Sequence, residues 1–363
     1  MDKALKFPFY AKASFFSVGL FAFISMLYIA QGIIVPFIFA VIIAILLHPV
    51  VNFFVGRKIN RIFSIIFTLI LAIIVIGAFT ALLFSQATRF SESWPKLVEK
   101  FTEILNHSIT WASGYFDISS QKINEWITTT KGELISTSSS AIGQTIVSVG
   151  GGVVVLFLIP VYIFMLLFYQ PLLLEFFRRL FGTNNRSQVS EIITQIKTVI
   201  QRYLVGLVIE AVLVAALNSI GLLILGIEYA VLLGIVGALL NVIPYIGGLV
   251  AVALPMMIAL ITKTSPWYAL YVLAVYYFIQ LIDNNYIVPK IVASKVKINA
   301  LVSIIVVIAF GALWGIPGMF LSIPLTAIVK LIFDHIEPLK PWGFLLGDTM
   351  PALAIFKIKL TKK

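Results

Sequence analysis

The sequence predicts an all-α polytopic membrane protein with about five full spans, two hairpins of opposite orientation broken by glycine and proline, and an extramembrane helical segment. Of the 363 residues, 61% are hydrophobic and only 11% are charged, and the mean hydropathy is +1.07. An ordinary globular domain is about 45–50% apolar and about 25% charged, so the excess must face lipid. A bilayer core about 30 Å thick takes about 20 apolar residues per helical crossing. The chain holds about eight hydrophobic segments separated by short polar joints.

Residues 1–88 are expected to form the first three spans. Residues 13–55 are too long for one crossing, so we expect two helices joined at Gln31-Gly32, the second returning across the membrane. The basic joint that follows, residues 57–61, is typical of the cytoplasmic side. The N-terminus is therefore expected in the cytoplasm, and a third span over residues 62–87 carries the chain to the outside.

Residues 89–140 are polar and are expected to form an extracytoplasmic segment. Apolar residues recur at helical spacing within it, from Trp94 to Leu105, which predicts an amphipathic helix. This segment can cover the protein's own spans, lie on the membrane or pack against a partner. A fourth span follows over residues 141–169, and the basic stretch of residues 175–202 returns the chain to the cytoplasm before a fifth span.

Residues 141–363 are expected to form a transport core around two long apolar segments, residues 229–262 and 300–333. Each is too long for one crossing and tight for two. The residues that break them are Pro244, Gly247 and Gly248 in the first, and Gly315, Pro317 and Gly318 in the second. Broken backbone at membrane depth persists only where it is buried in protein or lines a wet cavity.

The flanking charges predict that these two hairpins enter from opposite faces, the first from outside and the second from the cytoplasm, where the C-terminus also lies. Opposed, interrupted segments are the best sequence pointer to the substrate site of a secondary transporter. Ordinary kinked spans, with glycine for close packing, are the alternative.

A polar cluster ends the span that precedes the second hairpin. Gln280, Asp283 and Asn284 are spaced i, i+3 and i+4 and so share a helix face, Asn285 is adjacent, and Pro289 is expected to close the span. Carboxylate and amide groups can coordinate a cation or bind a hydroxylated ligand, and a carboxylate can take up a proton as the ligand leaves. The alternative is a helix end wetted by lipid headgroups.

Three further polar residues lie inside the apolar field. Glu210 is about eight residues into the fifth span, and Arg202 is about 12 Å away along the helix, too far to neutralise it. Its partner must come from another helix, as a structural hydrogen bond, or it must bind a proton. Asn241 and Tyr245 add donors beside the first break. We predict Asp283 as the coupling carboxylate, with Glu210 second.

Several classes of protein are disfavoured. The chain has no cysteine, and its three histidines lie far apart in sequence, so we expect no metal site, no cofactor and no enzyme activity. It also lacks the GxxxxGK[ST] motif of an ATP-binding loop. We attribute the net charge of +11 to basic residues on the cytoplasmic face rather than to nucleic-acid binding. A non-transporting envelope scaffold and a channel remain as rivals of a transporter.

Several motifs carry a family resemblance over nearly the whole chain. They are the run from Pro36 to Val50, the Pro244-Tyr-Ile-Gly247 motif, and residues 280–324, which read QLIDNNYIVPKIVASKVKINALVSIIVVIAFGALWGIPGMFLSIP. They resemble the autoinducer-2 exporter family. The chain departs from the family at Gly248, where proline is frequent, and at Asn299-Ala300, where His-Pro or Asn-Pro is common.

This resemblance implies a multi-pass secondary transporter of the inner membrane that functions as a homo-oligomer. Some members export a small polar signal, and others exchange cations for protons. We therefore expect export of a small polar solute coupled to H⁺ or another ion such as Na⁺, with cation/proton antiport as the alternative. The substrate itself is not implied.

Overall fold

The computed structural model describes residues 8–116, 157–180, 186–243, 247–292 and 298–350. Within these ranges the chain is almost entirely helical, and the one β pairing is an isolated bridge between Ile298 and Gly347. Among the described residues, five helices contain a stretch that is long and apolar enough to cross a membrane. They are α1 (Phe9–Ile29), α2 (Gln31–Gly56), α3 (Arg61–Phe116), α6 (Arg186–Ile224) and α10 (Ala300–His335). The protein is an all-α polytopic membrane protein, as the sequence predicts.

Shorter elements complete the fold. The helix Phe157–Phe168 meets α5 (Gln170–Leu180) at a bend of 64°, and the two together make a sixth candidate span. The remaining elements are α7 (Ala230–Asn241), α8 (Gly247–Thr262), α9 (Trp267–Ile282), the π-helix η2 (Asp283–Val292), the 3₁₀ turn η4 (Glu337–Leu339) and α11 (Lys340–Leu346).

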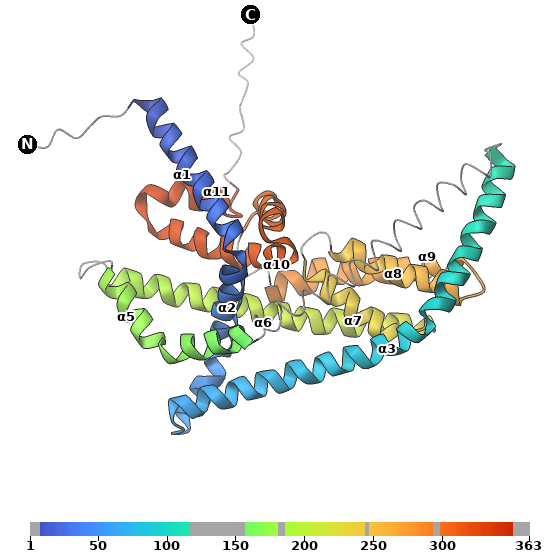
Figure 1. Ribbon diagram of the computed structural model, residues 1–363, viewed down its shortest axis with the longest axis horizontal. Coiled ribbons are helices and arrows are strands. Elements are labelled where there is room, and N and C mark those ends of the chain that lie inside the picture. Colours follow the sequence, from blue (N-terminus) through green and yellow to red (C-terminus); the bar gives the residue numbers. More distant parts are fainter. Residues whose placement is uncertain (1–7, 117–156, 181–185, 244–246, 293–297, 351–363) are drawn as a thin grey trace, which may run out of the picture.

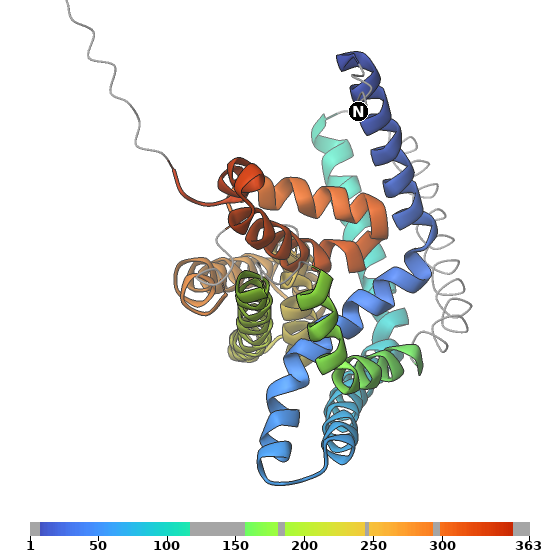
Figure 2. The same ribbon diagram turned by 90° about the vertical axis from the view of Figure 1, so that its left-hand side faces the viewer.

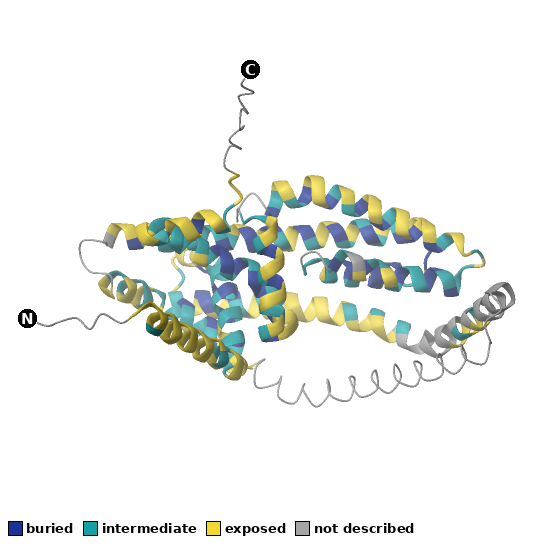
Figure 3. Cartoon of the chain, turned by 90° about the horizontal axis from the view of Figure 1, so that it is seen from above, coloured by how far each residue is buried: buried dark blue, intermediate teal, exposed yellow. Residues whose placement is uncertain are grey.

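The N-terminal helices meet in an elbow. α1 and α2 are separated by Ala30 alone, one residue before the expected joint, and they do not lie side by side (Figures 1 and 2). No described residue of α1 is buried, and its exposed side chains are mostly apolar, which suits a helix surrounded by lipid (Figure 3). α3 passes without interruption through residue 88, so the expected boundary between span and polar segment is not a helix end.

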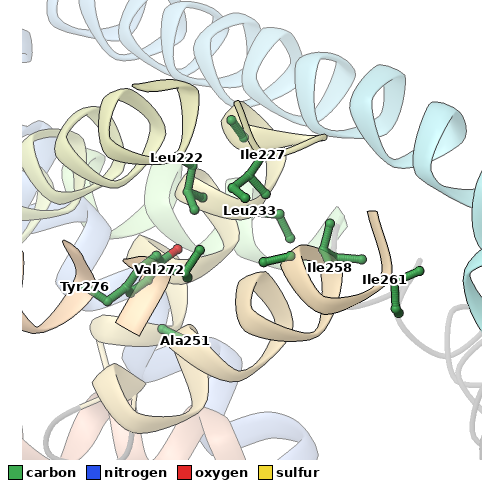
Figure 4. Close-up of a cluster of buried hydrophobic side chains, with 10 residues drawn as sticks. Leu222, Ile227, Leu233, Ala251, Ile258, Ile261, Val272 and Tyr276 are labelled. Carbon is green, nitrogen blue, oxygen red and sulfur yellow. The ribbon is translucent and has the colours of Figure 1, made fainter. Parts of the chain in front are cut away.

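The core is built around α6, which runs along the long axis beside α7 and α9, and α8 packs against α7 and α9 (Figure 1). Small residues let these helices approach closely: Gly234 lies against Ser219, and Gly221 lies against Val275. The side chains of the central apolar cluster interlock between the four helices (Figure 4). They include Leu222, Ile227, Leu233, Ala251, Ile258, Ile261, Val272 and Tyr276.

The first long apolar segment is broken where its glycines and proline predict. α7 ends at Asn241, α8 begins at Gly247, and the two helices pack against each other. A Cβ atom at Gly247 would collide with the backbone carbonyl of Leu240, so only glycine fits where the chain folds back. Pro244 and Tyr245, two of the residues expected here, lie outside the described residues.

The second long apolar segment, α10, turns back on itself at Gly315. That residue has φ 65° and ψ −145°, a conformation that side chains other than glycine rarely adopt. Beyond it Gly318 lies against the carbonyl of Phe310, and Met319 lies beside Gly311, so the two arms are in contact. The break expected at Gly315 is present, and α10 is a hairpin rather than one straight span.

The α10 hairpin is fixed at both ends. At its tip, Trp314 Nε1 donates a hydrogen bond to the Leu27 carbonyl near the elbow, at 3.1 Å. At its base, the Asn299 side chain accepts a bond from the backbone N–H of Val302 and donates to the carbonyl of Leu345. The asparagine at position 299 thus caps α10 and ties it to α11.

Candidate functional site

The site is centred on Asp283, the first residue of the π-helix η2. Its side chain is 1% exposed. One carboxylate oxygen, Oδ2, accepts a hydrogen bond of 2.9 Å from Asn241 Nδ2, at the broken end of α7. The other oxygen, Oδ1, is buried and has no hydrogen-bond partner among the residues that the structure describes. A buried carboxylate oxygen without a donor is costly, so this atom is available to a proton, a cation or a donor group on a ligand.

Glu210 lies on α6 within electrostatic range of Asp283. It is 6% exposed, so a second buried carboxylate lies within range of the charge on the first. Tyr203, two helical turns before it on α6, is buried as well and lies within range of the Glu210 charge. Arg202 is exposed, and no described cation pairs with Glu210. Two uncompensated carboxylates repel each other at low dielectric, so a proton or cation that joins them lowers the energy.

Gln280 completes the cluster from α9, one turn before Asp283. The start of α8 packs against the amide groups of the site. A Cβ atom at Gly248 would lie 2.9 Å from Gln280 Oε1 and 3.3 Å from Asn241 Oδ1. Asn241 on α7, Gln280 on α9 and Asp283 on η2 therefore lie close together. Glu210 on α6 lies within electrostatic range of Asp283, and all four residues were predicted from the sequence. Gly248 lies against the amide oxygens of Gln280 and Asn241.

The two neighbouring asparagines lie outside this cluster. Asn284 and Asn285 are exposed: Asn284 Oδ1 is 3.5 Å from Gln280 Nε2, and Asn285 Nδ2 donates to the Leu281 carbonyl at 2.8 Å. The predicted polar face is thus divided, with Asp283 turned inward and the asparagines outward.

Pro289 does not end the helix, contrary to expectation. The chain continues to Val292 in the wider π conformation, with Pro289 inside it. In an α-helix, proline removes a backbone donor and its ring clashes with the carbonyl four residues earlier. A π-helix pairs residues five apart instead of four, so the carbonyl four residues earlier is not the one that faces the proline. Such wide turns are frequent at functional sites.

The sequence reasoning missed one polar residue near the site. Tyr276 is buried on α9, and its hydroxyl has no hydrogen-bond partner among the described residues; the same is true of Asn218 Oδ1 on α6. Both side chains lie against Gly237. Tyr276, Gln280 and Asp283 are spaced i, i+4 and i+7, a helical pattern that could have identified Tyr276.

The break of the second hairpin lies elsewhere. α10 contacts α6, α2, α1 and α11, and within the described residues it does not reach α7 or α8. Trp314, beside Gly315, packs in an apolar cluster with Tyr203 and Val292, the last residue of η2. Gly315, Pro317 and Gly318 are thus not gathered at Asp283, and the connection between the two breaks runs through α6 and η2.

Comparison of the sequence with known proteins assigns the chain to a family. The family model described as AI-2E family transporter matches residues 17–337. YueF of Bacillus subtilis (strain 168), a transport protein by name, is 27% identical over 334 residues, covering 90% of this chain and 88% of its own. PerM of Escherichia coli (strain K12), a permease by name, is 26% identical over 328 residues, which cover 87% of this chain and 90% of PerM.

A third relative carries a substrate in its name. The AI-2 transport protein TqsA of Escherichia coli (strain K12) is 26% identical over 330 residues, which cover 88% of this chain and 90% of TqsA. The matches extend across both hairpins and the polar cluster between them. The chain belongs to the AI-2E family of transporters, and it is a multi-pass membrane protein.

Proposed function

We propose that this protein is a secondary transporter that exports a small polar solute across the inner membrane, with Asp283 as the coupling carboxylate and Glu210 as its partner. The observation that carries the proposal is the contact between Asn241 and Asp283. It joins the break of the first hairpin to a buried carboxylate that keeps one oxygen without a partner. Asn241 bonds the other oxygen of the same carboxylate, so a change in the occupancy of Oδ1 acts through that group on the residue at which α7 ends.

The proposed cycle uses competition for this oxygen. With a proton or cation on the Asp283–Glu210 pair, the repulsion between the carboxylates is relieved, and the Asn241 bond can hold the hairpin closed. A solute that brings hydroxyl or amine donors can replace that ion, with Gln280 as a further hydrogen-bonding group. Solute and ion then cannot occupy the site together, as exchange transport requires.

The test measures solute flux and its response to a pH gradient in proteoliposomes. A panel of small hydroxylated solutes and monovalent cations is screened first with the parent protein. Asp283→Asn preserves shape and removes the titrating charge, so we expect solute binding to persist and flux to lose its response to the gradient. Glu228→Gln is the control, because Glu228 is an exposed carboxylate in the loop before α7. Full coupling by Asp283→Asn would overturn the assignment and make Glu210→Gln the next variant.

Cation/proton antiport is the second candidate. The two adjacent buried carboxylates favour it, because they are suited to a monovalent cation as well as to a proton. In that case the parent exchanges Na⁺ for H⁺ without any organic solute, and Asp283→Asn abolishes the exchange. Intact transport and growth in Asp283→Asn and Glu210→Gln, with normal insertion, would favour a non-transporting scaffold. Unsaturable current through the parent would favour a channel.

The proposed orientation places both termini in the cytoplasm. In its support, Arg61 after α2 and Lys197 on α6, which come from separate basic stretches, both lie within electrostatic range of His48. The proposed orientation requires residues 57–61 and 175–202 to lie on the same side of the membrane, and the two stretches are neighbours at His48. The residues predicted to lie outside begin beyond residue 88 on α3. We also propose that the protein assembles as a homo-oligomer, as the resemblance implies.

A further inference from the structure

A second polar cluster lies far from Asp283, where α2, α3, α5 and α6 meet. Lys197 Nζ on α6 is 2.9 Å from His48 Nδ1 on α2. Arg61 Nη2, at the start of α3, donates to the Leu167 carbonyl at 2.6 Å and lies 3.3 Å from Gln170 Oε1 at the start of α5. The His48 ring lies within range of both cationic charges. We call His48, Arg61, Gln170 and Lys197 the basic cluster.

The basic cluster holds two cationic side chains, Arg61 and Lys197, and no described carboxylate forms an ion pair with either. The ion pairs of the described residues join Glu175, Asp334 and Glu337 to other cations, and none involves Arg61 or Lys197. The four side chains of the cluster are all half-buried. Like charges held together in a partly desolvated site repel, and an anion between them removes that repulsion.

The cluster also has donors to spare. Lysine can only donate, so His48 Nδ1 must be the acceptor of the Lys197 bond, and two N–H groups of Lys197 remain. Arg61 has five N–H donors, and its contacts to Leu167 and Gln170 both use Nη2. The remaining donors of one lysine and one arginine suit the several oxygens of a phosphate group.

The neighbouring helix indicates the depth of this site. α5 bends away from the helix before it by 64°, and it exposes Leu172, Phe176 and Leu180 together with Arg179, while Arg178 is half-buried. Apolar side chains and arginines on one short helix are typical of a segment lying in the interface between headgroups and acyl chains. Gln170, its first residue, brings the basic cluster to this level.

We infer that His48, Arg61, Gln170 and Lys197 form a binding site for a phosphate group at the cytoplasmic membrane surface. Two sources supply that chemistry: the headgroup of an anionic phospholipid and free inorganic phosphate. Either ligand would join α2, α3, α5 and α6 at a point distant from the proposed transport site. The inference does not depend on the transport function.

The test is ligand-dependent thermal stability of the full chain in detergent micelles. In one arm the micelles contain phosphatidylglycerol or, as the neutral reference, phosphatidylcholine. In the other, inorganic phosphate replaces chloride at constant ionic strength. A ligand at about 100 times its dissociation constant should raise the unfolding midpoint of the parent by about 5 °C.

Two variants and one control locate the effect. Lys197→Met and Arg61→Gln should each lose the shift, and Arg61→Gln serves if the first variant does not fold. Arg202→Gln should keep it, because Arg202 lies exposed on the same helix as Lys197 and its loss removes the same charge. A shift by phosphatidylglycerol alone identifies a lipid, and a shift by both ligands identifies phosphate in general. Absence of any shift in the parent, or equal shifts in all variants, overturns the site.

Discussion

Replacing Gly315 by alanine should destabilise the protein, although alanine is the best helix former. The backbone of Gly315 has φ 65° and ψ −145°, and no atom lies within 4 Å of the position that a Cβ would occupy. Steric clash with neighbours is therefore absent, and the cost comes from the backbone conformation alone. Residues in such sparsely populated regions cost about 1–3 kcal/mol.

The sign of the effect distinguishes two structures of α10. In a continuous helix over residues 300–335, Gly315→Ala would stabilise the protein by about 0.5–1 kcal/mol. In the hairpin it should lower the free energy of unfolding by about 1–3 kcal/mol, which changes the ratio of folded to unfolded protein by about 5-fold to about 160-fold. The two outcomes lie on opposite sides of the parent.

The assay is unfolding by sodium dodecyl sulfate in mixed micelles, followed by tryptophan fluorescence. Gly77→Ala is the control, because Gly77 lies within α3 and also has no atom within 4 Å of an added Cβ. It should leave the protein equally or more stable. If Gly315→Ala matches Gly77→Ala, the backbone reversal at Gly315 is refuted.

Three further predictions concern the hairpins and the topology. Gly247→Leu should abolish flux while the protein still inserts, because the added side chain meets the backbone of Leu240, which cannot rotate away; wild-type flux would contradict the close approach. Trp314→Phe removes the donor to Leu27 and should lower the free energy of unfolding by about 1–3 kcal/mol in the same micelle assay, and an unchanged value would contradict the bond. Tyr115→Cys, in a chain without cysteine, should react with a membrane-impermeant maleimide added outside, whereas Lys58→Cys should react only from the cytoplasm. The reverse labelling pattern would invert the topology.

The sequence was informative about where helices stop. Glycine and proline change the backbone itself, so their effects can be recognised without knowledge of the surrounding structure. Gly247 and Gly315 stand where the chain turns, and the N-terminal joint lies one residue from its predicted place, at Ala30. Pro289 shows the limit of this reasoning, because a helix can absorb a proline by widening its turn.

The contacts between distant residues could not be predicted. The bond between Asn241 and Asp283 joins residues 42 positions apart, and that between His48 and Lys197 joins residues 149 apart. Helical spacing says which residues share a face of one helix, but not which face of another helix they meet. For this reason the sequence identified Asp283 as a candidate and missed the basic cluster entirely.

In the π-helix η2, the number of residues matters as much as their identity for the position of the buried carboxylate. It is held at both ends, by the Asn241 contact at Asp283 and by the close approach of the Ile291 backbone to Gly206 on α6. The number of residues between two fixed points on a helix sets the angle between them. Deleting one residue, such as Asn285, would let the wide turns relax to ordinary α-helix and would rotate one end relative to the other. A variant without Asn285 should therefore hold its buried carboxylate at a different angle to Gly206, although every other residue is unchanged.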